Sequence, residues 1–86
     1  MYYIIRAHID DWNNDFIKVV SKHRTEIAAK NAMVKKVAEA IGFQSVEEFK
    51  MHDYERYTSV VEKGKVKDVY DSNGEFLYEY WQIVEI

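Results

Sequence analysis

The sequence predicts an α+β fold in which one antiparallel sheet of about five strands carries two helices on one face. Residues near both ends of the chain alternate between apolar and polar side chains, which is typical of strands. Between these ends lie two stretches with the start signals of helices. The expected order is therefore β-β-α-α-β-β-β. The 86 residues are expected to form one domain, 1–86, because they contain no repeat, no low-complexity linker and no proline.

Two strands are expected to open the chain as a hairpin. Residues 10–14 are rich in Asp and Asn and predict the turn. In residues 15–22, β-branched side chains alternate with lysines, which favours a second strand paired with the first. The first strand has one wholly apolar face, made of Tyr3, Ile5, Ala7 and Ile9, and one mixed face, made of Tyr2, Ile4, Arg6 and His8.

A first helix is predicted up to Ile41. Thr25 suits the N-cap, Glu26 lies favourably in the first turn, and Gly42 provides a left-handed stop. Lys30 interrupts the apolar stripe and has to extend its amine past it. The stripe consists of Ile27, Met33, Val34, Val37 and Ile41, and the side chains expected to face away are Asn31, Lys35, Lys36 and Glu39.

A second helix is predicted to begin at Val46. Ser45 and Glu48 form a capping box, in which each side chain satisfies a backbone N–H group at the helix start. We expect this helix to end near Glu55, because residues 57–61 are the run Tyr-Thr-Ser-Val-Val, which suits a strand.

The C-terminal third, residues 58–86, is predicted to be a three-stranded meander. Residues 71–74, Asp-Ser-Asn-Gly, are a turn signal between two of its strands. A three-residue loop at this turn sets Tyr70 against Phe76, Lys67 against Glu79 and Val66 against Tyr80.

The turn at residues 71–74 has an alternative loop, and the meander needs one further turn. A two-residue loop at Asn73-Gly74 would set Asp68 against Glu79, and two opposed acids are unfavourable. A turn at Lys63-Gly64 is expected to join the first two strands of the meander, because it aligns Val61 with Val66 and Tyr80, although a type I′ loop there forces a positive φ on Lys63. The preferred registers place four side chains together in the core under the helices: Val66, Tyr70, Phe76 and Tyr80.

Composition and charge restrict the class of protein. The chain has no cysteine, and so offers no disulfide, thiol nucleophile or zinc–cysteine site. No apolar run approaches the roughly 18 residues of a membrane span, and the basic start of a signal peptide is missing. We therefore expect a soluble, cytoplasmic protein. The net charge is −3, and residues 44–86 hold ten acids against five bases, which favours a basic partner over nucleic acid for that half.

Catalytic and metal-binding patterns are missing from the sequence. The three histidines are far apart and show no metal-ligand spacing. Asp11, Asn13 and Asp15 copy the opening of a calcium loop, but Phe16 stands where that loop needs Gly and Lys22 where it needs Glu. The three glycines serve as turns and helix stops, so no phosphate-binding loop remains. The sequence thus favours a protein that is not an enzyme and holds neither cofactor nor metal.

Two stretches are candidate partner-binding surfaces. The first is a polar loop tip with one aromatic, which can either anchor a partner or fold back onto its own sheet. It consists of Asp10, Asp11, Trp12 and Asn13. The second is an acidic run that can enter a basic groove of a partner or be an ordinary solvated helix face. It consists of Glu47, Glu48, Asp53, Tyr54 and Glu55.

A small nucleic-acid-binding accessory protein is the alternative function. Its phosphate contacts would come from bases on the second strand and the first helix. These bases are Lys18, Lys22, Arg24, Lys35 and Lys36.

The layout resembles that of small phage-encoded inhibitors of bacterial defence, the anti-CRISPR proteins among them. The likeness rests on the strand 16–20 leading to the Ala/Lys-rich helix 27–32, on the final strand 80–86, and on the size, acidity and lack of cysteine. The resemblance implies stoichiometric binding to a large nucleic-acid-handling complex, often through acidic residues that occupy a basic channel, in the cytoplasm of the host cell. It assigns a role to no individual residue.

A homodimer is a further expectation. Leu77, Trp81 and Ile83 are expected on the outward face of the last strand, alternating with glutamates, and such a patch needs a cover. The cover is either the N-terminal hairpin or a second copy, joined with Trp81 near the two-fold axis.

Overall fold

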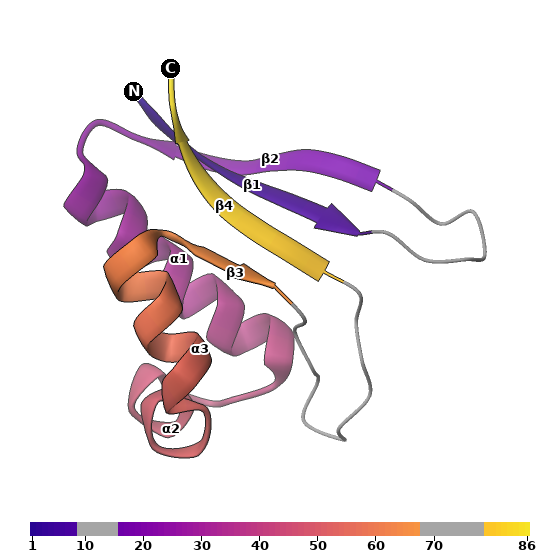
Figure 1. Cartoon of the computed structure of the whole chain (residues 1–86), viewed down its shortest axis with the longest axis vertical. Coiled ribbons are helices and arrows are strands. Elements are labelled where there is room, and N and C mark those ends of the chain that lie inside the picture. Colours follow the sequence, from indigo (N-terminus) through magenta and orange to yellow (C-terminus); the bar gives the residue numbers. More distant parts are fainter. Residues whose placement is uncertain (9–15, 68–78) are drawn as a thin grey trace.

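The computed structural model describes residues 1–8, 16–67 and 79–86, and it shows an α+β fold (Figure 1). The class predicted from the sequence is confirmed, and the described residues form four strands rather than about five, and three helices rather than two. The elements in chain order are β1 (Tyr2–His8), β2 (Phe16–His23), α1 (Glu26–Ile41), α2 (Val46–His52), α3 (Tyr54–Thr58), the π-helical turn η1 (Ser59–Lys63), β3 (Lys65–Lys67) and β4 (Glu79–Glu85).

The strands form one antiparallel sheet in the order β2-β1-β4-β3. β1 and β4 lie in the centre and bring the ends of the chain together, so that the Ile86 N–H donates to the Met1 carbonyl over 2.9 Å. β2 and β3 are the edge strands. All three helices lie on the same side of this sheet (Figure 1).

The core lies between α1 and the helix-facing side of the sheet. Three strands contribute to it through Ile4, Val66 and Trp81, each at most 3% exposed. Phe49 of α2 and Val60 of η1 are fully buried beside them. α1 adds Met33, Val34, Val37, Ala38 and Ile41 to this cluster.

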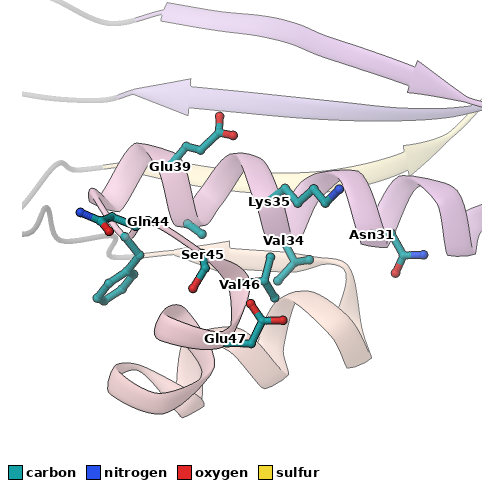
Figure 2. Close-up of a pocket in the computed structure, with 10 residues that line it drawn as sticks. Asn31, Val34, Lys35, Glu39, Gln44, Ser45, Val46 and Glu47 are labelled. Atoms are coloured by element: carbon teal, nitrogen blue, oxygen red, sulfur yellow. The ribbon is translucent and has the colours of Figure 1, made fainter.

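The predicted ends of α1 are confirmed. The Thr25 hydroxyl accepts from the Ala28 N–H over 3.1 Å, and Gly42 adopts the left-handed conformation at φ 105°. Ile27, however, is 74% exposed, so its place in the apolar stripe was wrong. Ile27 lies on the same flank of α1 as Val34, one heptad earlier. The segment around Val46 lies beside Val34 (Figure 2). Ile27 is exposed because this segment does not reach the first turn of α1.

The capping box of α2 is confirmed, but the predicted end near Glu55 is wrong. The Glu48 N–H donates to Ser45 Oγ over 3.1 Å, and the Glu48 carboxylate accepts from the Gln44 N–H over 2.9 Å. α2 ends at His52, because Asp53 leaves the helical conformation at φ −145°, ψ 61°. The Asp53 carboxylate then caps α3 and pairs with Arg56 at 3.1 Å.

Residues 57–61 are helical, and their assignment to a strand was wrong. Val60 is fully buried, and Tyr57 meets Phe49 edge-on with ring centroids 6.0 Å apart. Helical spacing places both side chains on the core, and this burial outweighs the β propensity of the run. Gly64, at φ 65°, stops the helical segment, so the expected turn at Lys63-Gly64 and the pairing of Val61 with Val66 are not formed.

The register of β3 on β4 differs by one residue from the preferred one. Val66 lies opposite Trp81 and Lys67 opposite Tyr80, which is the register of the two-residue-loop alternative. A slip of one residue exchanges the faces of a strand. Trp81 is accordingly buried at 1% exposure and Tyr80 is exposed at 37%, the reverse of the prediction. The predictions for Tyr70, Phe76 and Leu77 fall on residues outside the described ranges.

Candidate protein-binding surface

The side of the sheet that faces away from the helices is called here the open face. In β1 the mixed face, with the buried Ile4, turns toward the helices, so the apolar face lies on the open side. Strand pairing then assigns the other members. The open face comprises Tyr3, Ile5 and Ala7 of β1, Ile17, Val19 and Lys22 of β2, Lys65 and Lys67 of β3, and Tyr80, Gln82 and Val84 of β4.

The open face carries exposed apolar side chains on its edge strand β2 and on the central strand β4. Ile17 is 76% exposed, Val19 56% and Tyr80 37%. The Tyr80 hydroxyl donates to Gln82 Oε1 over 2.8 Å, so it is held flat along β4. An antiparallel sheet with one solvated face normally carries polar side chains there. Exposed apolar side chains that lie together on a solvated face are a feature that interaction surfaces share.

The charges on the open face are all basic within the described ranges. Lys22 lies at one end of β2, and Lys65 and Lys67 flank the face from β3. The acidic side chains that the structure describes lie in the helical layer or, as Glu79 and Glu85 do, on the helix-facing side of β4. The two sides of the molecule therefore differ in charge.

A β-bulge divides the bases proposed for nucleic-acid binding. The register of β2 shifts between Ile4 and Ile5, which leaves Val20 as the extra residue. Lys18 therefore lies opposite Arg6 on the helix-facing side, whereas Lys22 lies opposite Tyr3 on the open face. Lys35 borders a groove on α1 (Figure 2). Lys18 and Lys22 therefore do not share one face of the sheet.

A part-buried ion pair between Arg6 and Glu79 joins β1 to β4 on the helix-facing side of the sheet. Both oxygens of Glu79 accept from Arg6, at 2.9 Å from Nε and 2.6 Å from Nη2. The Trp81 indole donates to the same carboxylate over 3.1 Å, and His8 Nδ1 lies 3.6 Å from it. The Glu79 side chain is only 4% exposed. The sequence patterns did not single out this cluster, because its members are far apart in the chain and Glu79 was expected outside.

The same cluster supports the start of β2. The Phe16 ring stacks on His8 with centroids 5.4 Å apart, and Lys18 Nζ lies 5.1 Å from the Phe16 ring centre. The guanidinium carbon Cζ of Arg6 lies 5.9 Å from the same ring centre. Phe16 thus anchors β2 to β1 while the next residues of β2 are exposed.

The acidic run predicted as a partner surface is only partly available. The carboxylates of Glu48 and Asp53 accept hydrogen bonds that cap helices. Glu47, Tyr54 and Glu55 are exposed. Glu47 borders the groove beside α1, whereas Glu55 borders a different hollow with Val66 and Lys67. The four loop-tip candidates, Asp10, Asp11, Trp12 and Asn13, lie outside the described residues.

The groove between α1 and the start of α2 measures about 560 Å³. Lys35 and Glu39 of α1 border it on one side, and Val46 and Glu47 on the other (Figure 2). The Ser45 hydroxyl in its wall already accepts the capping hydrogen bond. Its lining brings together no nucleophile with a base, and across the described ranges no three His, Asp or Glu side chains gather as a metal site.

Comparison with known proteins gives no relative: no family model, no curated protein and no solved structure matches this chain. No helix in the described part of the chain combines the length and apolarity needed to cross a membrane. The function has to be inferred from the surface of the molecule.

Proposed function

We propose that this chain is a non-enzymatic protein-binding module whose open face contacts its partner. The observation that carries this proposal is the exposure of Ile17 and Val19 on the open face, on its edge strand β2. Aliphatic side chains at this exposure gain free energy when a partner removes them from water, at about 25 cal/mol per Å² of apolar surface. Tyr80 on the central strand β4 adds an aromatic contact of the kind that is enriched in interfaces.

A second proposal concerns the helical layer. We propose as the partner a nucleic-acid-handling protein complex, which the chain would inhibit by stoichiometric binding in the manner of phage-encoded anti-CRISPR proteins. The exposed Glu47, Tyr54 and Glu55 support it, since acidic and aromatic side chains suit a basic channel. The net charge of −3 agrees with such a partner.

Capture of partners by matched variants tests both proposals. The tagged chain is compared with Ile17→Thr/Val19→Thr, with Glu47→Lys/Glu55→Lys, and with the control Ile27→Thr. Ile27 is as exposed as Ile17, at 74% against 76%, but lies on α1. We expect a protein that the parent and the control capture to be lost from the β2 variant. In sedimentation of the purified parent complex, we expect one copy of this protein per chain. Equal capture by the parent, the β2 variant and the control would contradict the open-face interface. Selective loss from the glutamate variant would assign binding to the helical layer.

A further inference from the structure

The first half of β2 is an exposed edge. Phe16, Ile17, Lys18 and Val19 are all exposed, and β2 is the outermost strand next to β1. The backbone N–H and C=O groups on its outer side have no strand beside them in the described structure. An extended segment can add to such an edge as a further strand.

Two structural features restrict where an added strand fits. The bulge at Val20 bends β2, so regular pairing extends only over residues 16–19. The opposite edge, β3, has three residues in the part of the chain that the structure describes, and its Lys65 carbonyl already accepts from the Ser59 hydroxyl over 2.5 Å. The first half of β2 is therefore the better edge.

The charges of β2 decide which occupant fits this edge. Its ionic side chains, Lys18 and Lys22, are basic, and Arg24 follows directly. Pairing with a second copy of β2 would bring bases together, which is destabilising. A single-stranded nucleic acid needs aromatic faces for stacking, but Ile17 and Val19 are aliphatic and Phe16 already stacks on His8.

Resting on the protein-binding function proposed above, we propose that the occupant is an extended acidic segment of a partner protein, paired with residues 16–19 of β2. Side chains of an added strand alternate between the two faces. Those beside Ile17 and Val19 lie on the open face and are apolar. Those beside Lys18 lie on the helix-facing side and are carboxylates. The recognised pattern is a short run in which apolar and acidic residues alternate.

Titration of the ¹⁵N-labelled chain with two matched peptides tests this inference. The probes are Val-Glu-Val-Glu-Val and Val-Lys-Val-Lys-Val, both with blocked ends. We expect the acidic peptide to shift amide resonances of β2 and its neighbour β1 and to bind more tightly than the basic one. Lys18→Glu should weaken the acidic peptide about fivefold and reverse the preference. Lys35→Glu, which makes the same charge change on α1, should leave both affinities unchanged.

Every other outcome overturns the inference in a distinct way. Equal binding of both peptides at β2 removes the acidic preference, and shifts elsewhere or none at millimolar peptide remove the β2 edge. Resonances of β2 that move with protein concentration alone indicate self-pairing. A twelve-residue oligo-dT that shifts the open face at lower concentration than the peptide indicates nucleic acid. None of the peptide results refutes the protein-binding function itself, which fails only if capture is independent of Ile17 and Val19.

Discussion

Replacing Glu79 by Gln should destabilise the fold more than any surface change of the same chemistry. Glu79 receives two hydrogen bonds from Arg6 and one from Trp81, at 2.6–3.1 Å, with its side chain 4% exposed. Gln keeps one oxygen acceptor but presents an N–H group to the guanidinium, so a charge-assisted bond is lost and Arg6 keeps a positive charge without its counter-charge. Removing one partner of a fully buried pair costs about 3–5 kcal/mol, and because the Arg6 side chain is 26% exposed we expect the lower end of this range, about 3 kcal/mol.

Thermal and urea unfolding followed by circular dichroism measure this cost. A loss of 3 kcal/mol should lower the melting temperature of a domain of this size by at least about 12 °C. Glu39→Gln on the exposed side of α1 is the control, and it should change the free energy of unfolding by less than about 0.5 kcal/mol.

The double variant Arg6→Met/Glu79→Gln separates charge from packing. It removes the uncompensated guanidinium, and the Gln oxygen can still accept from the Trp81 indole. We expect it to be more stable than Glu79→Gln alone. The cluster does not hold the sheet together as argued if Glu79→Gln costs no more free energy of unfolding than the Glu39 control. The same follows if the double variant loses as much as the single variants Arg6→Met and Glu79→Gln lose together.

Three further predictions follow from single positions. Gly64→Ala should cost about 1–2 kcal/mol in urea unfolding, because Gly64 sits at φ 65°, where a Cβ is strained, and a cost near zero would contradict that conformation. In a Trp12→Phe variant the remaining indole, Trp81, should emit at short wavelength and resist iodide quenching, because it is 1% exposed; quenching as in the unfolded chain would place it outside. The negative charge of Glu85 raises the pKa of Tyr2, helped by burial, a hydrogen bond to Glu85 and the charge of Glu26. The contribution of Tyr2 to stability is thus complete below about pH 10 and is lost as pH rises through the raised pKa. Glu85→Gln should therefore lower the pKa of one tyrosine in an ultraviolet titration. An unchanged titration would contradict the contact between Tyr2 and Glu85.

The helix starts and the end of α1 were predictable because their signals are local. Thr25, Gly42 and Ser45 act on backbone groups within four residues of themselves, so the sequence alone determines the contact. The end of α2 was not predicted, since Asp53 can continue a helix or start one, and its pairing with Arg56 decides the outcome.

The faces of the strands were not predictable in the same way. Both faces of β1 carry apolar side chains, and the buried face is chosen by Ile4 and Arg6 meeting Ile83 and Trp81 across the strand pair. That choice depends on residues more than seventy positions apart. The Arg6–Glu79 pair could not be predicted either, because its members are equally far apart in the chain. Without this pair, the sequence pattern placed Trp81 on the outward face as a dimer contact. Burial of Trp81 removes it from the two-fold axis of the expected homodimer.

The Arg6–Glu79 pair also explains why the open face is apolar. Glu79 and Trp81 must both lie on the helix-facing side to meet Arg6, and this fixes Tyr80, Gln82 and Val84 on the other side. A slip of β4 by one residue could bury Tyr80 and Val84 only by exposing Trp81 and separating Glu79 from Arg6. The apolar open face is thus maintained by the core itself. With apolar side chains on both faces, β1 has the pattern of a strand that is covered on both sides. The helices cover one side (Figure 1). On the protein-binding function proposed above, the partner covers the other.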